Sequence, residues 1–539
     1  MPGLVDLILE WLRGYPAGYE RLLSMIGIEV HWAILQYVLG LPLLAVLAEA
    51  IWLRTGNEHW KRLSRNLAKG FAVVFAVGAA SGTASEFGLI LLWPNLTEAA
   101  GRYIYFPLYL EIFAFITEVV FIYLYFYADG RVSPRAHLLI GVLALAGAWF
   151  SGAMILSVNS FMQSPANVLA NYDPTTGSWA PPEVLLFVPA QVAQALDAQK
   201  LAAVGGKILE SGADYVLVSL PAGLVRALMG QAFAGYTVGE SLLAAVARPE
   251  AAQALASVPL KSVLDSIVAN TVRHAGVYTI TFKSGTYVAT FVHSIGAAVT
   301  VSAFTVMGAY ALRLLRTPRD DPDREYFRRA FRFAAVAALV AVAIQGTGSG
   351  HAMGAAVAEF NPEKFAAMEG TSEQITSLPA LIHAEGLVHG KLMPLLAYGS
   401  TSAVIPSYDL IQSDFRPPLV VHYLYYTKIG LGVLLGLVAL AAVVYLRRSD
   451  EPPGWALKLS AASPVLAQVV SFLGWAVREI GRKPWAIYGI MDVQTELTVN
   501  PPPTWQLMLV ATYLAALLAL LFAVVYAYLW KREEGREVS

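Results

Sequence analysis

Long apolar runs, separated by short polar segments, dominate this chain of 539 residues. Nine of the runs are long enough to cross a bilayer, which takes about 20 residues in a helix. They lie near residues 26–53, 67–93, 104–127, 136–157, 286–312, 333–350, 420–446, 459–477 and 506–530. The pattern predicts an all-α membrane protein with nine transmembrane helices.

The composition supports a membrane protein and excludes several other classes. Charged residues make up only 14% of the chain, whereas an ordinary globular protein has about 25%. This charge is too sparse to coat the several cores that a soluble chain of this length would form. The formal net charge of −1 gives no reason to expect a nucleic-acid partner. The absence of cysteine excludes disulfides, thiolate metal sites and cysteine nucleophiles.

The distribution of basic residues predicts the orientation of the chain. Lys and Arg concentrate in the short connections that follow the first, third, fifth and seventh runs, and in the C-terminal tail. Such connections usually face the cytoplasm. We therefore expect the N-terminus outside and the C-terminus in the cytoplasm, in a multi-pass protein of the cell membrane.

The runs and their connections divide the chain into five parts. Residues 158–285 are expected to form an outward-facing, mostly helical insertion, in which Pro221 and Arg226 argue against a further span. Residues 351–419 are expected to form an ordered loop or lid over the outer surface. The other parts are 1–157 with an interfacial helix near 3–13 and helices one to four, 286–350 with helices five and six, and 420–539 with helices seven to nine and a cytoplasmic tail.

Ionisable residues inside the apolar runs are the candidates for chemistry, because each is costly to insert into a membrane. These residues are Glu29, His31, Glu86, Glu111, Glu118, His293, Lys428, Glu479 and Arg482. Nearly all of them fall in the outer half of the predicted bundle. For Glu29 and Arg482, a side chain that extends to the membrane surface is an equally good interpretation. Glu49, at the inner end of the first run, is expected to extend to the surface in that way.

Two histidines on separate helices at similar depth, His31 and His293, suggest haem ligation, because imidazole is a common axial ligand of haem iron. The alternative for each histidine alone is a hydrogen-bonded packing residue. A polytopic transporter would also bury such groups, but would more typically break its helices near the midplane.

Several segments, in order along the chain, resemble subunit I of cytochrome bd-type quinol oxidases. The segment 474–485, GWAVREIGRKPW, resembles the G-R-x-P-W hallmark of that family. The others are His31, SGTASEF at 81–87, the pair Glu111 and Glu118, NSFMQSP at 159–165, FVH at 291–293 and KFAAME at 364–369. The resemblance covers nearly the whole chain except about 170–275.

The resemblance implies a role for each matching residue. His31 would be an axial ligand of the oxygen-site haem, a haem d or a third haem b, and Glu479 would ligate or abut a high-spin haem b. His293 would hold a low-spin haem b. Trp475, Arg482 and Asn159 would surround Glu479. Lys364 and Glu369 would bind or deprotonate quinol. Glu111 and Glu118 would deliver protons or coordinate haem d.

Two departures from the family pattern affect the expected low-spin haem and the proton route. Glu111 and Glu118 are seven residues apart instead of eight. In the seventh run, Lys428 stands at the position of the family's methionine ligand, and Tyr426 at that of an arginine.

The missing methionine leaves three ways to complete the iron site opposite His293. Lys428 ligates iron as the neutral amine, which burial favours. His422 is a rival, six residues earlier in the same run. In the third case the iron is five-coordinate, and a charged Lys428 pairs with a haem propionate.

The resulting prediction is a subunit of a quinol oxidase of the aerobic respiratory chain. It would oxidise quinol outside and reduce O₂ to water with cytoplasmic protons, and so contribute to a membrane potential. Its expected partners are a second membrane subunit, with room for a small accessory subunit, and the lipid bilayer. Two alternatives remain: a related haem oxidoreductase with a donor other than quinol, and a transporter.

Overall fold

A computed structural model gives the structure of residues 19–372 and 389–495. It also describes Trp505, Met508, Leu509, Thr512, Tyr513, Ala516, Ala519 and Leu520. The predicted interfacial helix near 3–13 lies outside the described residues, as does most of the ninth apolar run.

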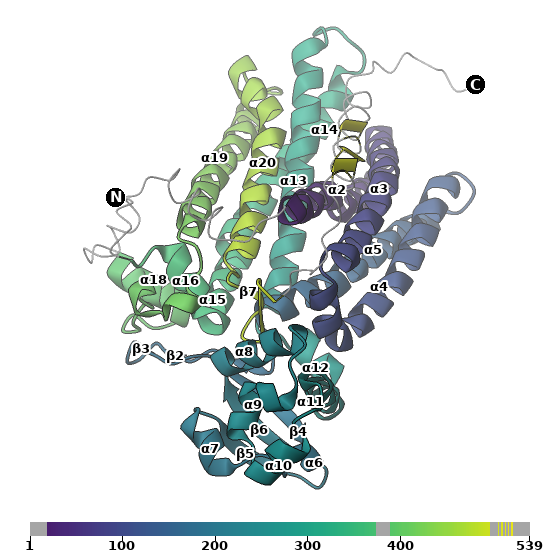
Figure 1. Cartoon of the computed structure of the whole chain (residues 1–539). Coiled ribbons are helices and arrows are strands. Elements are labelled where there is room, and N and C mark those ends of the chain that lie inside the picture. Colours follow the sequence, from purple (N-terminus) through teal and green to yellow (C-terminus); the bar gives the residue numbers. More distant parts are fainter. Residues whose placement is uncertain are drawn as a thin grey trace.

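Long helices run alongside one another and form most of the molecule (Figure 1). They are α2 (Tyr19–Thr55), α3 (Glu58–Leu92), α4 (Pro94–Tyr127), α5 (Pro134–Gln163), α13 (Tyr287–Arg316), α14 (Arg324–Ile344), α19 (Val420–Arg448) and α20 (Gly454–Ile480). Through a π-helical turn at Gln345–Ser349, α14 continues into α15 (Gly350–Phe360). Each of the first eight predicted runs therefore contains helix.

Among the described residues, seven helical segments are long and apolar enough to cross a membrane. The predicted run 67–93 lies in α3, which is not one of the seven. The first turns of α3 carry several charged residues, and the helix is partly exposed along its length. The helical membrane architecture is confirmed, whereas the number of nine spans is not.

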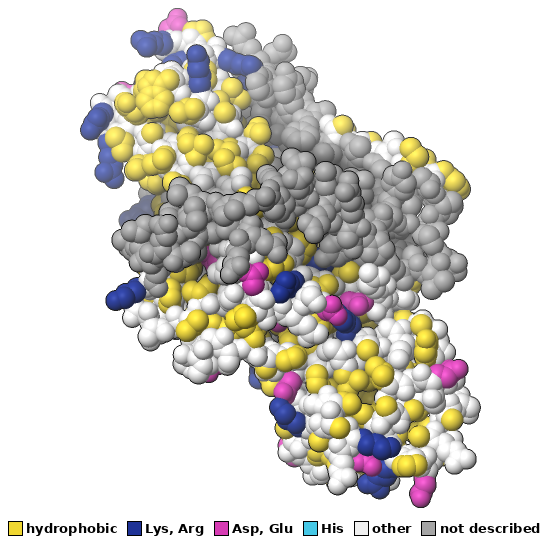
Figure 2. Space-filling view, turned by 60° about the vertical axis from the view of Figure 1, so that its left-hand side comes forward, with side chains coloured by type: hydrophobic (Ala, Val, Ile, Leu, Met, Phe, Trp, Pro, Cys, Tyr) yellow, Lys and Arg dark blue, Asp and Glu magenta, His cyan; other side chains and the backbone are white. Residues whose placement is uncertain are grey.

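Helix α2 lies at the centre of the bundle and packs against α3, α5 and α13. The contact with α13 is close: a Cβ atom built on Gly40 would lie 2.5 Å from the carbonyl oxygen of Ala298. Buried apolar side chains, including Ile34, Leu44 and Phe304, fill the space between these helices. A space-filling view shows many hydrophobic side chains on the described part of one face of the bundle, with Lys and Arg near one end (Figure 2).

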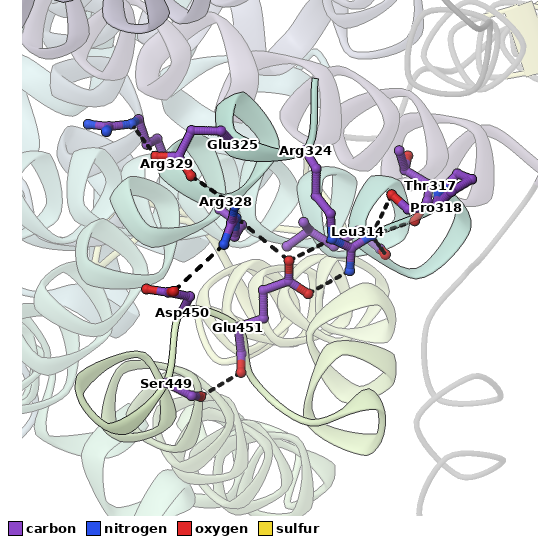
Figure 3. A network of polar contacts seen from close by, with 10 residues as sticks. All are labelled: Leu314, Thr317, Pro318, Arg324, Glu325, Arg328, Arg329, Ser449, Asp450 and Glu451. Atoms are coloured by element: carbon purple, nitrogen blue, oxygen red, sulfur yellow. Dashed lines mark hydrogen bonds and ion pairs between the residues drawn. The ribbon is translucent and has the colours of Figure 1, made fainter. Parts of the chain in front are cut away.

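Ion pairs join the short connections between helices at one end of the bundle. Arg62 at the start of α3 pairs with Asp323 before α14, at 2.6 Å. Arg324 donates to Glu451 in the α19–α20 connection, at 2.5 Å, within a wider polar network (Figure 3). These are connections that the sequence analysis assigns to the cytoplasmic side. We call this end of the bundle the connection end.

Residues 168–282 form a mixed α/β domain at the opposite end of the molecule (Figure 1). Its antiparallel sheet has the order β1 (Val168–Leu169), β4 (Glu183–Pro189), β6 (Tyr215–Pro221) and β5 (Lys207–Ser211), and Leu186 pairs with Val218. Its helices are α6 (Ala190–Ala193), α7 (Ala198–Ala203), α8 (Ala222–Phe233), α9 (Leu242–Val246), α10 (Pro249–Ala254), α11 (Leu260–Ala275) and α12 (Val277–Phe282), with the 3₁₀ turn η1 (Val238–Glu240). A small hairpin pairs β2 (Tyr172–Asp173) with β3 (Ser178–Trp179).

The sheet is a part of this domain that the expectation of a mostly helical insertion did not include. Strands β4 and β6 are short, mostly apolar segments of seven residues, EVLLFVP and YVLVSLP. Periodicity alone cannot distinguish such a short run from a buried helix. The stretch 214–233 is strand β6 followed by α8, so it is not a span, as expected.

The segment 351–419 also contains helices. After α15 come α16 (Pro362–Glu369), α18 (His389–Tyr398), η3 (Tyr408–Leu410) and η4 (Ser413–Phe415). Asn361 caps α16 by accepting a hydrogen bond from the amide of Lys364, and Gly370 ends it with φ of +68°. All eight residues of α16 are buried. The described part of the expected loop or lid therefore contains a short helix that lies inside the fold.

Candidate functional site

Residues from the ends of α5 and α20 meet around Glu479. One carboxylate oxygen of Glu479 accepts a hydrogen bond from Asn159 at 2.9 Å, and the other accepts one from Arg482 at 2.8 Å. Arg482 is 6% exposed and also donates to the carbonyl of Ala486, which excludes a side chain extended to the membrane surface. The structure thus brings together three of the residues that the sequence analysis grouped.

Arg478 completes this cluster, although its position next to Glu479 gave no sign of its role. Its guanidinium donates to the side-chain oxygen of Asn159 and, at 3.0 Å, to the hydroxyl of Thr290 on α13. It is 7% exposed. Arg478 therefore orients Asn159, which in turn binds Glu479. The predicted run 459–477 ends just before Arg478, so the sequence pattern placed this residue outside the span.

His31 and Trp475 line the same region from α2 and α20. Nδ1 of His31 lies 3.0 Å from the hydroxyl of Ser81, and a Cβ on Gly82 would lie 2.9 Å from the His31 ring. Trp475 stacks on Trp32, with ring centroids 5.0 Å apart. Glycine at 82 thus leaves space for the imidazole against α3.

Glu29 is buried near this cluster. Its exposed fraction is 8%, and its charge interacts with that of Glu479. The alternative of a side chain extended to the membrane surface is wrong for Glu29. The reason is that α2 is central in the bundle, so its outer end faces other helices.

His293 on α13 faces the π-helical turn that follows α14. The side-chain amide of Gln345 lies 3.1 Å from Nδ1 of His293 and 3.0 Å from its carbonyl oxygen. Gly346 and Gly354 have nothing within 4 Å of a built Cβ atom. The glycine beside the imidazole is Gly350, the first residue of α15, where a built Cβ would lie 3.9 Å from the His293 ring and 2.6 Å from the carbonyl oxygen of Gln345.

Lys428 on α19 points toward α20 and interacts electrostatically with His293. Its aliphatic chain passes Gly474, where a built Cβ would be 3.4 Å away, and its Nζ lies 4.9 Å from the centre of the Tyr425 ring. In the described parts of the chain, no hydrogen bond or ion pair engages Nζ.

His422, the rival of Lys428, packs against α16. Its Nδ1 lies 3.0 Å from the carbonyl oxygen of Met368, and a Cβ on Gly370 would be 2.5 Å from its ring. It is 1% exposed. His422 therefore has a structural task at the end of α16.

Helix α16 carries three buried ionisable side chains that point in different directions. Lys364 donates to the side chain of Gln163 at 3.2 Å and to the carbonyl of Arg478 at 3.0 Å. Glu369 accepts a hydrogen bond from Tyr426, and Glu363 accepts one from Tyr488 at 2.8 Å. Lys364 and Glu369 are about 140° apart around the helix. The structure places them on one short helix but not on one face.

Burial shifts the pKa values of these three groups. It lowers the pKa of Lys364 well below its ordinary value and raises the pKa of Glu369 to about 7. The pKa of Glu363 is also raised to about 7 by burial. Burial disfavours the charged form in each case. The two carboxyls can therefore exchange a proton near neutral pH, and burial favours the neutral amine of Lys364.

Glu111 and Glu118 lie on the side of α4 that faces α5. Glu111 accepts a hydrogen bond from Ser151 on α5 at 2.9 Å. Glu118 is 3% exposed, and a Cβ on Gly147 would lie 3.2 Å from its Cα atom, so the two helices approach closely there. With a spacing of seven, the two carboxyls share one stripe of the helix.

Glu49 differs from its expected position. It is 3% exposed and is bonded to Tyr125 and His137. The expectation that it extends to the membrane surface is wrong, because the inner end of α2 also faces three neighbouring helices.

The residues around His31, Glu479 and His293 fit haem groups. Among the described residues, three buried polar atoms near Glu479 have no hydrogen-bond partner: Oε2 of Glu29, Nε1 of Trp475 and Nε of Arg482. Such atoms are normally satisfied, so they indicate a polar ligand. Near His293, the amine of Lys428 would serve as a second ligand of a haem iron.

Comparison with known proteins gives a consistent result. The family model for cytochrome bd terminal oxidase subunit I matches residues 19–246 and 266–535. It therefore includes most of the mixed α/β domain, and the expectation that about 170–275 falls outside the family holds only for 247–265.

Curated relatives and a solved structure resemble the chain over most of its length. A putative cytochrome bd menaquinol oxidase subunit I of Bacillus subtilis (strain 168) is 24% identical over 97% of this chain and 96% of its own length. Subunit 1 of the cytochrome bd-II ubiquinol oxidase of Escherichia coli (strain K12) is 24% identical over 91% of each chain. The bd oxidase of Geobacillus thermodenitrificans has a similar fold, with a TM-score of 0.67 at 21% identity, covering 95% of this chain and 97% of that one. The chain therefore belongs to the cytochrome bd terminal oxidase subunit I family of multi-pass plasma-membrane oxidoreductases.

Proposed function

We propose that this chain is the haem- and quinol-binding subunit of a membrane oxidase that oxidises quinol on the outer side and reduces O₂ to water. The observation that carries the proposal is a contact between two candidate sites. Nζ of Lys364, on α16, donates to the carbonyl oxygen of Arg478, the residue before Glu479. The candidate quinol helix thus touches the last turn of the helix that bears a candidate haem ligand.

In this proposal, three haem groups are held by ligands from four helices. His31 binds the oxygen-site haem, a haem d or a third haem b, and Glu479 binds a high-spin haem b. His293 and Lys428 bind a low-spin haem b. When bound, the haems carry electrons one at a time and bind oxygen.

The protein residues around Glu479 set its position and charge. Asn159 and Arg482 each donate to one of its oxygens, so the carboxylate is held in a fixed orientation. Arg478 holds Asn159 in turn. Trp475 packs on Trp32 beside His31 and closes the space between α2 and α20.

Lys364 and Glu369 are the proposed acceptors of the quinol protons. Burial lowers the pKa of Lys364 and so favours its neutral amine, and it raises the pKa of Glu369 to about 7, so the carboxylate is accessible near neutral pH. Their different directions mean that substrate contacts them from two sides of α16, or that each acts at a different stage. Protons released there leave on the outer side.

Protons for oxygen reduction come from the cytoplasm through Glu118 and Glu111. Both lie on one stripe of α4, and Glu118 is buried between α4 and α5. Uptake on one side and release on the other contribute to a membrane potential without a pump. A second membrane subunit, a small accessory subunit and lipid complete the assembly, and the exposed aromatic face of α4, which includes Tyr109, Phe113 and Tyr123, suits either contact.

A reduced-minus-oxidised spectrum of the purified complex, followed by quinol-dependent oxygen consumption, tests the proposal. Haem bands together with quinol-driven turnover are the expected result. Haem bands without quinol oxidation would instead support a donor other than quinol, and a flat spectrum would contradict the oxidase.

A further inference from the structure

A buried polar cluster lies at the connection end of the bundle, where α2, α4 and α5 meet. Oε1 of Glu49 lies 2.6 Å from Nδ1 of His137, and Oε2 accepts a 2.6 Å hydrogen bond from the hydroxyl of Tyr125. The Tyr125 ring stacks on His137, with centroids 4.6 Å apart. A Cβ on Gly141 would lie 2.6 Å from the Tyr125 ring, so α5 is shaped to admit it. The proposed function has no role for this cluster so far.

The partners of His137 determine how many protons the pair holds. Nε2 of His137 lies 2.9 Å from the backbone carbonyl oxygen of Tyr125, which can only accept, so Nε2 carries a proton. One more proton occupies the contact between Nδ1 and Glu49. The pair is therefore neutral overall, either as acid and imidazole or as carboxylate and imidazolium. An overall neutral pair is the form that burial tolerates.

The cluster also has a place for one further proton. If Oε2 of Glu49 is protonated, it donates to the hydroxyl oxygen of Tyr125. That hydroxyl lies 3.2 Å from Ser64 on α3, and either oxygen can be the donor, so Tyr125 can turn its own proton to Ser64. The additional proton thus reverses these two hydrogen bonds, with Tyr125 as acceptor from Glu49 and donor to Ser64.

Charged groups near the cluster connect it to the aqueous surface. Asp129, in the α4–α5 connection, interacts electrostatically with His137 and Tyr125. It pairs with Arg65 at 2.5 Å, with 31% and 49% of the two side chains exposed, and Lys61 also acts on it. A partly exposed carboxylate thus interacts with the buried pair.

Helix α4 connects the cluster to the two carboxyls proposed to deliver protons. Tyr125, Glu118 and Glu111 follow one another at intervals of seven residues, about 10 Å each along the same stripe. In the described structure, Oε1 of Glu118 is buried and has no hydrogen-bond partner. A buried acceptor without a partner is the group that a proton arriving from Tyr125 and Glu49 would meet next.

We propose that Glu49 and His137 form a proton-holding pair that supplies Glu118 from the connection end. This inference rests on the proposed function, because oxygen reduction is the step that consumes protons there. Tyr125 is a positioning residue that allows the pair to hold its additional proton.

The substitution Glu49→Gln in the complete oxidase tests the inference. Glutamine keeps the size and polarity of the side chain but cannot hold the proton. Oxygen consumption with quinol should fall at least about 10-fold, because a general acid or base typically contributes about 100-fold or more. The rate at which quinol reduces haem without oxygen should not change. The matched control is Glu58→Gln, an exposed carboxyl at the same end, which should keep full turnover.

Two results would overturn the inference: unchanged oxygen consumption in Glu49→Gln, or an equal loss of anaerobic haem reduction, which would show a defect in electron entry. If Glu49→Gln does not assemble with haem, His137→Gln is measured in the same way. Infrared titration separates this inference from the proposed function. In the wild type, acidification should produce the carbonyl band of a protonated carboxyl that Glu49→Gln or His137→Gln lacks, even if quinol proves not to be the donor. Identical bands in wild type and variants would contradict the pair.

Discussion

The hydroxyl of Tyr426 donates a 2.5 Å hydrogen bond to the carboxylate of Glu369 and so joins α19 to the last turn of α16. Tyr426 is two residues before Lys428, and Glu369 is a proposed acceptor of quinol protons. His422, one turn earlier on α19, holds the carbonyl of Met368. The proposed quinol helix and the helix of a proposed haem ligand are therefore linked by two side-chain contacts.

Tyr426→Phe should shift the pH dependence of quinol oxidation. Burial raises the pKa of Glu369 to about 7, and the Tyr426 hydrogen bond acts against that rise by stabilising the carboxylate. Without the bond the pKa rises further, so the carboxylate needed as a base is lost at a higher pH. A hydrogen bond to a charged group is worth about 1.5–3 kcal/mol, which corresponds to about one pH unit or more.

The measurement is kcat/KM for quinol as a function of pH. The acid limb should move to higher pH in Tyr426→Phe but not in Tyr423→Phe, which removes a neighbouring hydroxyl on the same helix. An acid limb that stays in place would exclude this role of Tyr426.

Lys364→Ala and Glu369→Ala should impair quinol oxidation without loss of haem. Each removes a proposed proton acceptor, a contribution of about 100-fold or more. Steady-state kinetics with quinol and a haem spectrum of each variant check this. Normal kinetics in both variants would favour a donor other than quinol.

His31→Ala should abolish oxygen reduction while quinol still reduces the low-spin haem. The His31 imidazole lies against Ser81 and Gly82 on α3, whereas His293 is on α13. The substitution therefore removes one proposed ligand only. Oxygen consumption and anaerobic haem reduction, measured on the same preparation, give the two readouts. Turnover at the wild-type rate would contradict His31 as a ligand of the oxygen site.

Lys428→Met and Lys428→Ala should have opposite effects on the haem held by His293. Methionine restores an axial ligand, so the haem should stay low-spin, with a higher potential because a thioether favours reduced iron. Alanine removes the ligand, and the haem should become high-spin. Spectra and redox titration of both variants decide the matter; a low-spin haem in Lys428→Ala would exclude lysine ligation.

Gly40→Ala should destabilise the bundle. The added Cβ would lie 2.5 Å from the carbonyl oxygen of Ala298, a backbone atom that cannot move aside without shifting α13. Overpacking of this kind costs about 1–3 kcal/mol. Thermal unfolding in detergent should show a lower midpoint than in Gly436→Ala, a control on α19 where the nearest atom to the added Cβ is 4.0 Å away. Equal midpoints would contradict the close α2–α13 contact.

The sequence by itself determined the class of the protein and most of its long helices. Length and hydropathy of the apolar runs are local properties, and a bilayer-spanning segment must satisfy its backbone hydrogen bonds within the helix. The motif residues were also visible, because Glu479 and Arg482 are neighbours one turn apart at the end of α20. The strands β4 and β6 were not, since a short apolar run fits a helix as well as a strand.

Only the tertiary structure decided which of these residues meet. Asn159 and Glu479 are 320 positions apart and touch because α5 and α20 end at the same level of the bundle. Glu49 is buried because α2 is the central helix, a fact that its own hydropathy does not contain. Lys364 and Glu369 point to different neighbours because they lie on different faces of α16, and α20 and α19 pack against those faces. Contacts between helices depend on how their faces pack, and a pattern along one chain segment does not carry that information.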